Sequence, residues 1–232
     1  MRPVGLHLRL ATSLSELLKK ALRIKSPVMQ CFFVLQSTNK YIKFSPEEID
    51  TCRQLTKQFD KVFLHSSYWV NLAGCTRNGW RPFMRELDYA KKVGFTHMVI
   101  HPGSATGCTT KEEGIECLAK ALNKILPEED EITIVLENTA HARMSVGGDL
   151  EDFRLLLSLL DSPDKIAFCI DTAHAHSYGY DVITPEGQDA FLALVDDIIG
   201  KERLALLHLN DTTENKGSRI DKHSSLEDGK IG

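Results

Sequence analysis

Short apolar runs recur along the chain, and most of them end on a polar residue. They are rich in β-branched and aromatic side chains, which is typical of buried strands. The runs are Val4–Leu8, Val28–Leu35, Val62–His65, Met98–His101, Ile132–Glu137, Ile166–Asp171 and Leu204–His208. The pattern of hydrophobic and polar positions therefore predicts seven strands.

The segments between these runs carry apolar residues at the spacing of amphipathic helices. They are Leu14–Leu22, Pro46–Phe59, Arg81–Val93, Lys111–Leu126, Leu150–Leu160 and Pro185–Ile199. Two of them begin with a clear signal, because Ser45 and Thr184 each place a capping hydroxyl before a proline and acidic residues. Strands that alternate with helices of this length indicate βαβ units and a parallel sheet.

Five consecutive predicted strands end in a side chain that can bind a metal ion. They are His65, His101, Glu137, Asp171 and His208, at intervals of 36, 36, 34 and 37 residues. In a TIM (β/α)8 barrel all strand ends of this kind open onto one face, where the active site lies. In an open doubly wound sheet they would spread along one edge, and five could not meet at one point. The repeat therefore favours an α/β TIM barrel, of which seven strands are visible in this chain.

Two local extensions enlarge the set of candidate ligands. His174 follows Asp171 by three residues, within reach of one helical turn, and Asp221 and His223 lie two apart on one side of an extended segment. The set then holds five imidazoles and three carboxylates, with no cysteine. Such ligands suit zinc, manganese or iron, and eight of them suit two or three ions. Ion clusters of this kind clamp the oxygens of a phosphate ester and generate hydroxide near neutral pH.

Each of these residues also has an ordinary structural interpretation. A single histidine at a strand end is more often a hydrogen-bonding group, and Asp171 alone is equally well a helix cap or an ion-pair partner. Packing does not readily explain why such residues recur at the same position, the end of the strand, in five consecutive repeats. Three histidines fall off the repeat and are assigned to structural roles: His97, His141 and His176. The basic cluster within Lys19–Lys25 is interpreted as a solvated helix face and its exit.

Composition and charge refine this prediction. The chain has 232 residues, which fits one large domain or two small ones, and its 42% hydrophobic and 26% charged residues are ordinary for a soluble protein. With seven strands in the repeat, we expect a single barrel domain over residues 1–232 that is short of the last βα unit. Its net charge of -4 gives no support for nucleic-acid binding. Three divalent ions against three carboxylates and one hydroxide would nevertheless leave a local charge of about +2, which attracts phosphodiesters.

The remaining sequence signals concern the cellular setting. No run of 18 apolar residues and no signal-peptide pattern is present, so we expect a cytoplasmic protein without a membrane span. The six cysteines are scattered and form no CxxC pair, which predicts reduced core thiols and neither a disulfide framework nor a thiolate metal site. These cysteines are Cys31, Cys52, Cys75, Cys108, Cys117 and Cys169.

Several segments around the candidate ligands resemble the signature motifs of endonuclease IV, in the same order. They are His65–Leu72, His101–Ser104, Glu137–Ala140, Asp171–Asp181, His208–Asp211 and Gly217–His223. The resemblance runs from Gly5 onward. It implies a zinc-dependent TIM barrel that cuts double-stranded DNA 5′ to abasic sites, leaves a 3′-hydroxyl and also processes 3′-blocked ends. A monomer is expected as the default state of a closed barrel.

The resemblance also implies a ligand set for up to three zinc ions, with manganese as an alternative at one of them. By ion, the implied ligands are His65, His101 and Glu137, then Glu137, Asp171 and His208, then His174, Asp221 and His223. Glu137 would join the first two ions, and together they would hold the attacking hydroxide. The third ion would steady the leaving oxygen.

Contacts to DNA are implied less directly. Tyr68 matches a family tyrosine in a loop that enters the minor groove and flips out the abasic sugar, and Trp69 beside it is suited to wedge or stack. The alternative for both is a hydrophobic anchor of that loop. Gln36–Tyr41 occupies the second recognition loop with a different sequence, in which Lys40 is the candidate groove contact. Further contacts are assigned to Ser104, Arg219 and Lys222, and His7 matches a histidine that supports the site.

Two departures from the family pattern bear on activity. Ser66 stands where the family often has an acid, which predicts a looser orientation of His65. The family also continues through an eighth strand that ends in a glutamate ligand of the second ion, and these residues contain neither.

Two other functions compete with the nuclease. One is a sugar isomerase or epimerase, because related barrels use histidine and carboxylates around a single ion. The other is an inactive truncated homologue that only binds. The Gly217–His223 segment and the Asp171–His174 pair favour the nuclease, since a single-ion enzyme needs neither. The number of metal ions per chain separates the two enzymes.

Overall fold

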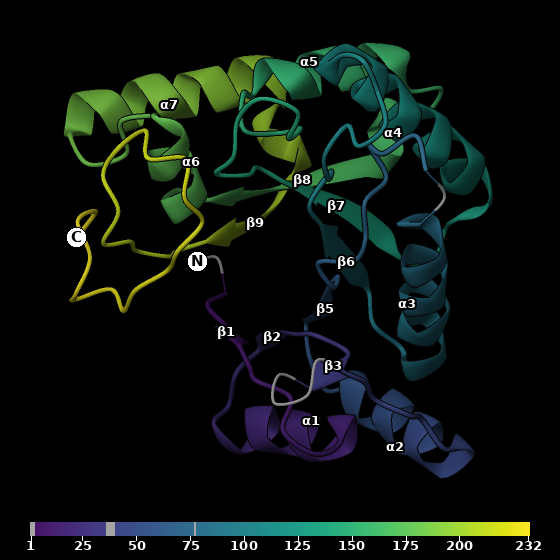
Figure 1. Cartoon of the computed structure of the whole chain (residues 1–232). Helices are drawn as coiled ribbons and strands as arrows, with labels where there is room; N and C mark the ends of the chain where they lie inside the picture. Colours follow the sequence, from purple (N-terminus) through teal and green to yellow (C-terminus); the bar gives the residue numbers. More distant parts are fainter. Residues whose placement is uncertain (1–2, 36–39, 77) are drawn as a thin grey trace. The chain divides into compact units, whose positions relative to one another are not determined.

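The computed structural model describes residues 3–35, 40–76 and 78–232. Two compact units are present, the first made of residues 1–70, 80–100 and 129–134, the second of residues 71–79, 101–128 and 135–232. The seven strands of the main sheet are hydrogen-bonded in the order β1-β2-β5-β6-β7-β8-β9, which follows the chain. The strands predicted from the apolar runs are therefore present, and helices separate most of them (Figure 1).

The first unit holds the parallel strands that begin the sheet. They are β1 (Leu6–His7), β2 (Val28–Cys31), β5 (Lys61–His65) and β6 (His97–Ile100). Its helices are α1 (Leu14–Arg23), α2 (Pro46–Thr56) and α3 (Trp80–Val93). The predicted start signal of α2 is confirmed, since the Ser45 side chain accepts a hydrogen bond from the Glu48 N–H and Pro46 takes the first turn.

The predicted strand Val28–Leu35 is wrong in its second half. β2 ends at Cys31, and β3 (Val34–Leu35) instead pairs antiparallel with β4 (Lys40–Tyr41) in a separate small sheet. The side chain of Phe33, between the two strands, packs against Phe44 and Phe95 with ring centroids 5.3 and 5.1 Å apart. A continuous apolar run hides this change of direction because Cys31, Phe33 and Val34 are all buried across it. Residues Gln36 to Asn39 of the predicted recognition loop lie outside the described residues.

The second unit holds the end of β7 (Thr133–Glu137) and the strands β8 (Ile166–Asp171) and β9 (Leu204–His208), of which β8 and β9 pair in parallel. Its helices are α4 (Lys111–Ile125), α5 (Glu151–Leu159), α6 (Thr172–Tyr178) and α7 (Pro185–Ile198) (Figure 1). Single 3-10 turns precede β7, β8 and β9 at Leu126–Glu128, Pro163–Lys165 and Lys201–Arg203.

Helix α6 was not predicted, because seven residues are too few to show a helical period. It begins directly at the end of β8, where the Asp171 side chain accepts a hydrogen bond from the His174 N–H. It ends at Gly179, whose φ of 127° is open to glycine but not to most other residues. The short helix therefore brings His174 back over the carboxylate that starts it.

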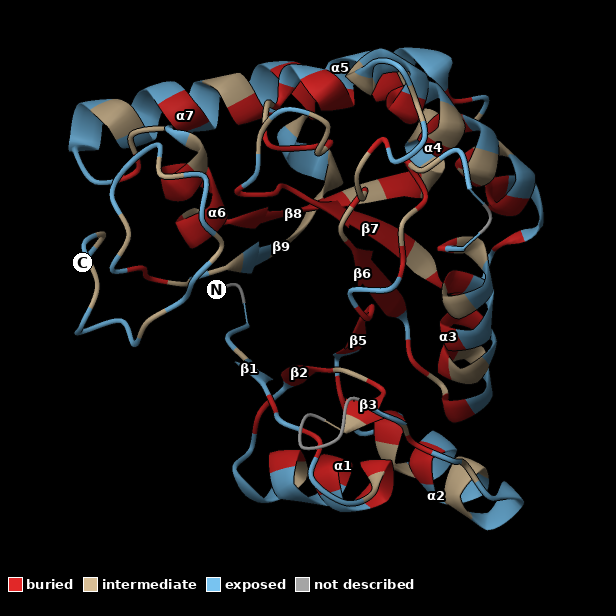
Figure 2. Ribbon diagram, viewed as in Figure 1, coloured by how far each residue is buried: buried red, intermediate tan, exposed pale blue. Residues whose placement is uncertain are grey.

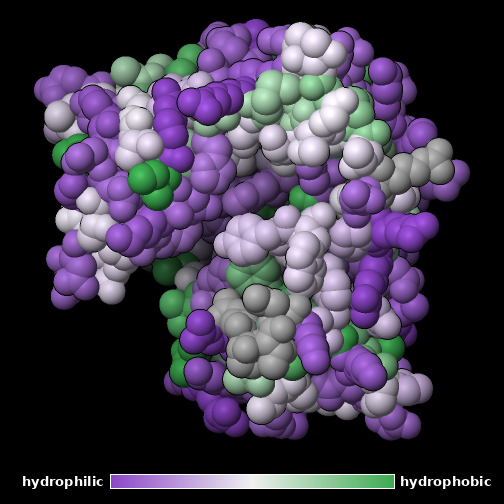
Figure 3. Space-filling view, in the orientation of Figure 1, coloured by the Kyte–Doolittle hydropathy of each residue, from purple (hydrophilic) through white to green (hydrophobic). Residues whose placement is uncertain are grey.

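Burial follows the strands. Every residue of β2 and β6 is buried, whereas Leu6 of β1 and Leu207 of β9 are about half exposed (Figure 2). The face of the molecule in Figure 3 is mostly hydrophilic, with apolar side chains in small groups. Within the described part of the chain, no helix combines the length and the apolar character that a membrane span requires.

The cysteine prediction is correct for three residues and wrong for two. Cys31, Cys52 and Cys169 are buried free thiols, and burial raises the pKa of all three. Cys75 and Cys108, by contrast, are joined in a disulfide across 33 residues of sequence. Their spacing carried no signal, because only the folding of two loops brings the residues together.

Candidate metal centre

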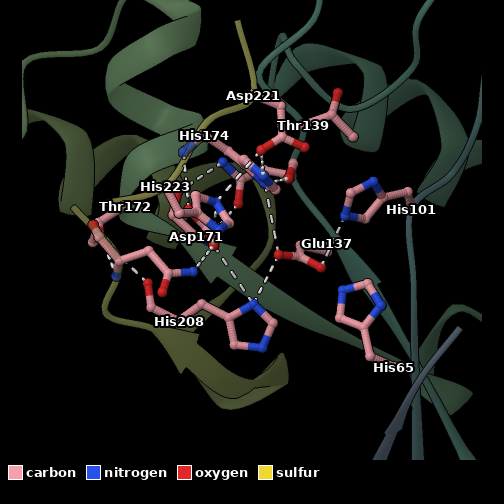
Figure 4. A network of polar contacts seen from close by, with 12 residues as sticks. His65, His101, Glu137, Thr139, Asp171, Thr172, His174, His208, Asp221 and His223 are labelled. Carbon is pink, nitrogen blue, oxygen red and sulfur yellow. Dashed lines mark hydrogen bonds and ion pairs between the residues drawn. The ribbon is translucent and has the colours of Figure 1, made fainter. Parts of the chain in front are cut away.

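The polar ends of three strands meet in the second unit. Glu137, Asp171 and His208 are the last residues of β7, β8 and β9, and His101 follows β6 immediately. Parallel strands end at the same edge of a sheet, so these side chains project to one side (Figure 4). Two residues from the C-terminal segment, Asp221 and His223, complete the group together with His174 of α6.

Glu137 lies at the centre of this group and is only 1% exposed. One carboxylate oxygen, Oε2, lies 3.2 Å from Nε2 of His101, and the other, Oε1, lies 2.8 Å from Nδ1 of His208. Burial by itself would raise the pKa of Glu137, but the charges and hydrogen bonds of His208 and His101 outweigh it and hold the pKa well below its usual range. Glu137 is therefore an ionised carboxylate that faces a different imidazole with each oxygen.

The two carboxylate oxygens of Asp171 have different roles, one in capping a helix and one in facing the candidate ligands. Its Oδ1 caps α6 by accepting from the His174 N–H at 2.9 Å. Its Oδ2 accepts from the side-chain amide of Asn210 at 2.6 Å and lies 3.7 Å from Nδ1 of His208 and from Nε2 of His223. The helix-cap interpretation of this carboxylate is therefore confirmed through Oδ1, and Oδ2 stays a candidate ligand atom.

Asn138 orients two of these residues, and the sequence interpretation missed it. Its backbone carbonyl accepts a hydrogen bond from Nδ1 of His174 at 2.8 Å. Its side chain accepts from the Asp171 N–H at 2.6 Å and donates to the Asp171 carbonyl at 3.2 Å. Because Nδ1 of His174 donates, its Nε2 is the nitrogen that faces the site. The position directly after Glu137 was the only signal for Asn138.

A second imidazole–carboxylate group surrounds Asp221. Its Oδ1 lies 3.1 Å from Nε2 of His174 and 3.5 Å from Nε2 of His223. Burial opposes the charged form of His174, but the carboxylates of Asp171, Asp221 and Glu137 outweigh it and raise the pKa of His174 to about 10. Burial likewise opposes the charge of Asp221, yet His174 and His223 lower its pKa to about 2. The Asp221 Oδ1 and the His174 Nε2 are held together by a cation between them, which is either a proton or a metal ion.

The spacing of these atoms fits divalent ions. Bonds of about 2.0–2.1 Å in a tetrahedral zinc site place neighbouring ligand atoms roughly 3.3 Å apart. The nitrogen–oxygen distances from His174 and His223 to Asp221 are 3.1 and 3.5 Å, and that from His101 to Glu137 is 3.2 Å. The buried Nε2 of His174 makes no hydrogen bond of good geometry, which is expected of a ligand atom. The donors present therefore suit zinc-like ions.

His65, the remaining predicted ligand, lies in the first unit at the end of β5. It is buried, and its Nδ1 lies 2.9 Å from the Ser66 carbonyl oxygen. Its ring packs on Phe32 and His7, with centroids 4.8 and 5.8 Å away. The backbone carbonyl of Ser66 and the two rings orient this imidazole, and the nearby Glu86 carboxylate interacts with it electrostatically. The ring of His7 is itself held by Gln30 at 2.9 Å.

Known proteins share this sequence and this fold. Residues 27–232 match the family described as the xylose isomerase-like TIM barrel. A probable endonuclease 4 of Thermotoga neapolitana is 30% identical over the whole chain and 83% of its own length, and one of Halorhodospira halophila is 33% identical over the whole chain and 81% of its length. The chain belongs to the endonuclease IV family. The crystal structure of endonuclease IV from Thermus thermophilus superposes with a TM-score of 0.83 at 29% identity, covering the whole chain and 84% of that protein. The predicted TIM-barrel fold is thereby confirmed.

Two aromatic residues that the resemblance assigned to DNA contacts, Tyr68 and Trp69, follow β5 in the first unit. Tyr68 is 78% exposed and Trp69 is 49% exposed. The Trp69 ring lies 5.4 Å from the ring of Tyr41, over which the Arg85 guanidinium is stacked at 4.2 Å. Trp69 is therefore partly an anchor for its loop, whereas Tyr68 presents most of its ring to solvent. Lys40 is exposed on β4.

The polar DNA candidates of the second unit are held by their neighbours. The Ser104 hydroxyl donates to the Met144 carbonyl at 3.1 Å, and Lys222 pairs with Glu214 at 3.5 Å. The Arg219 guanidinium lies 3.7 Å above the ring of Tyr178, and its backbone has a φ of 64°. The Nδ1 of His141 lies 3.1 Å from the Arg219 carbonyl, which supports that strained backbone.

The two other histidines off the repeat are buried. His97, in the first unit, lies 2.7 Å from the Thr96 hydroxyl, and burial followed by the charge of Lys61 lowers its pKa to about 4. His176, in α6, is 2% exposed, and burial lowers its pKa as well. Both are therefore neutral near pH 7, in contrast to His174.

Proposed function

We propose that this chain is a metal-dependent DNA-repair endonuclease that hydrolyses the phosphodiester 5′ to abasic sites in double-stranded DNA, and that it also processes 3′-blocked ends. The observation that carries the proposal is the group of three carboxylates, Glu137, Asp171 and Asp221, each facing imidazole nitrogens at 2.8 to 3.7 Å. Relatives named probable endonuclease 4 and, in Plasmodium falciparum, apurinic-apyrimidinic endonuclease 1 support it.

Three ions are the occupancy that this donor set supports best. Their ligands would be His65, His101 and Glu137, then Glu137, Asp171 and His208, then His174, Asp221 and His223. When bound, such ions lower the pKa of coordinated water and neutralise phosphate charge, the work that this reaction requires. Manganese is an alternative at one position.

The chain's own residues set up this chemistry. Glu137 is held ionised by His208 and His101, so both of its oxygens are available as ligands at neutral pH. Asn138 and Asn210 fix the orientations of His174 and Asp171 through short hydrogen bonds. Because the groups are ordered beforehand, little reorganisation remains when substrate arrives.

Binding of DNA would combine local charge with an exposed ring. The net charge of -4 does not favour DNA, so the ions supply the local positive charge that a phosphodiester needs. Tyr68 offers an exposed aromatic face for the gap left by a missing base. Arg219 and Lys222 lie next to Asp221 and His223 in sequence and are the candidate phosphate contacts.

The deciding experiment is a nicking assay on a duplex with one abasic site, in the presence of zinc or manganese. We expect a single cut 5′ to the lesion, and its loss in Glu137→Ala. The matched control is Asp189→Asn, an exposed carboxylate of α7 in the same unit, which should cut normally. A folded, metal-loaded chain that leaves the duplex intact would overturn the proposal.

The role of Tyr68 has its own test. Tyr68→Ala should weaken binding to the abasic duplex roughly 5- to 100-fold, because aromatic stacking on nucleic acid contributes about 1–3 kcal/mol. Fluorescence anisotropy with labelled DNA measures this change, and an intact duplex serves as the reference. Trp69→Ala should instead lower thermal stability, since Trp69 packs on Tyr41. Equal effects of both variants on DNA affinity would contradict this division of roles.

A single-ion sugar isomerase is the competing function. Structural neighbours of that kind, such as a D-psicose 3-epimerase at 12% identity and a TM-score of 0.60, share only the fold. The group formed by His174, Asp221 and His223 favours the nuclease, because one ion at Glu137 would leave it without a purpose. In the chain with its Cys75–Cys108 disulfide intact, elemental analysis that finds two or three ions per chain supports the nuclease, and one ion supports the isomerase.

A further inference from the structure

Three cysteines of the second unit converge from three segments of the chain. Cys75 lies in the non-helical segment 71–76, Cys108 lies just before α4, and Cys117 lies within α4. All three sulfur atoms lie within 4.8 Å of one another. Cys75 and Cys108 are joined as a disulfide, and Sγ of Cys117 lies 3.2 Å from Sγ of Cys75.

A disulfide alone does not account for this cluster, because it uses two cysteines and leaves the third sulfur in contact with it. Backbone hydrogen bonds hold the two loops in register, from the Cys75 N–H to the Thr106 carbonyl at 3.0 Å and from the Ala73 N–H to the Pro102 carbonyl at 3.1 Å. Cys117 is fixed by the helix. The fold therefore presents three sulfurs at one point before any ligand arrives.

We propose that the reduced form of Cys75, Cys108 and Cys117 is a binding site for one thiophilic cation, of which zinc is the principal example. A thiol or phosphine reductant supplies two electrons and two protons to the disulfide, which yields two thiols. The three thiols then lose their protons and bind the cation as thiolates. Soft sulfur ligands select such ions over magnesium or calcium.

The geometry suits this ion with little movement. Zinc–sulfur bonds of about 2.3 Å in a tetrahedral arrangement place the sulfurs roughly 3.8 Å apart, within the span of the present cluster. Cys75 is exposed and the other two are partly exposed, so an ion has access. The fourth position is left to water or to an incoming group. The bound ion would fasten the segment 71–76 to the loop that follows His101.

This site is separate from the imidazole–carboxylate centre, which needs none of these cysteines, and it does not rest on the proposed nuclease activity. Cys169 requires a control of its own. It lies beside Glu137 and His208, close enough to share an ion with them, and is completely buried.

Cadmium titration of the whole, phosphine-reduced and chelator-stripped chain tests the proposal, because a sulfur-to-cadmium charge-transfer band in the ultraviolet reports thiolate ligands only. We expect the band to saturate at one thiolate-bound ion per chain. Cys117→Ser should weaken this binding more than about 100-fold, since loss of even an outer partner of a metal ligand costs 10- to 100-fold. Cys31→Ser and Cys169→Ser should leave it unchanged.

Three results would overturn the proposal. They are a reduced wild-type chain without the band, a Cys117→Ser chain that keeps it, and loss of the band in Cys169→Ser, which would assign it to the other centre. Cys75→Ser provides a second variant at an exposed position, where folding is least at risk, and it should also lose the band. Far-ultraviolet circular dichroism verifies that each variant is folded.

Discussion

Two buried glutamates, one in each unit, show how differently the same side chain is used. Glu86 of α3 and Glu137 of β7 are each 1% exposed. Glu86 accepts hydrogen bonds from neutral groups, the Tyr41 hydroxyl at 2.7 Å, the Ser67 N–H at 3.0 Å and the Ser67 hydroxyl. Glu137 faces the imidazoles of His101 and His208.

The consequence is a pKa shift in opposite directions. Burial raises the pKa of Glu86, and its hydrogen bonds together with the charge of one imidazole, His65, do not fully offset that effect. At Glu137 the imidazoles outweigh burial, and the pKa falls. Burial alone therefore does not identify a carboxylate with a function. The chemical type of the groups that contact the carboxylate is the better indicator. A carboxylate fully satisfied by hydroxyl and amide donors fixes a loop, whereas one surrounded by imidazoles is suited to hold a cation.

The largest expected effect is at Glu137. Glu137→Gln keeps the size of the side chain but removes the charge that would join two ions. We expect the nicking rate to fall roughly 1,000-fold, because the charge stabilisation that metal ions contribute is several kcal/mol and each 1.36 kcal/mol is tenfold. Single-turnover kinetics on the abasic duplex measures this. Glu86→Gln is the comparison, and an equal loss of rate in folded Glu86→Gln would break the distinction.

The next effect is on metal binding as a function of pH. His174, with a pKa raised to about 10, carries a proton at pH 7 that zinc must displace. Affinity at its site should therefore rise about tenfold per pH unit up to about pH 10. Calorimetry in two buffers of different ionisation heat counts the released proton, which His174→Gln should abolish. His97→Gln should not change the count, because the pKa of His97 is about 4 and it is neutral at pH 7.

The same shift governs the stability of the metal-free chain. The folded pKa of His174 lies above its ordinary 6.5, so its contribution is fully present below that pH and is lost as pH rises through about 10. Asp221 has the opposite sign, since its pKa is lowered to about 2, and its contribution is lost as pH falls from 3.8 towards 2. A metal-free chain whose urea midpoint rises steadily from pH 7 to pH 10 would contradict the assignment for His174.

A smaller effect is expected on folding at Glu86. Glu86→Gln places an amide group opposite donors of Tyr41 and Ser67, so buried donors lose an acceptor. We expect the free energy of unfolding to fall by about 1–3 kcal/mol, measured by urea denaturation. The control is Glu16→Gln on α1, where Glu16 and Lys19 form an exposed pair, and the urea midpoint should stay unchanged.

The smallest expected effect is at Ser67. Ser67→Ala removes one hydroxyl from the Glu86 network and leaves the backbone N–H and the Tyr41 hydroxyl in place. A loss of about 1 kcal/mol is expected, the net value of a typical hydrogen bond. Should Ser67→Ala destabilise the chain more than Glu86→Gln, the carboxylate would not be the centre of this network.

Much of the fold was predictable because its elements are regular. Strands β5 to β9 and helices α1 to α5 and α7 follow long apolar periods, and the predicted bounds differ by only a few residues. The β3–β4 pair and α6 were missed because two to seven residues carry too little pattern. The candidate ligands of the second unit were predictable, since one register of the repeat places Glu137, Asp171 and His208 at strand ends.

The sequence by itself determined the repeat of βα units, the polar residue that closes each of five strands and the family of the chain, because these depend on local periodicity and on ordered motifs. Only the tertiary structure decided which groups meet. Asn138 acts on His174 from 36 residues away, Glu86 meets Ser67 and Tyr41, and three scattered cysteines share one point. The physical reason is that hydrogen bonds and metal ligation depend on distances of a few ångströms between atoms, and loops set these distances without leaving a period in the sequence.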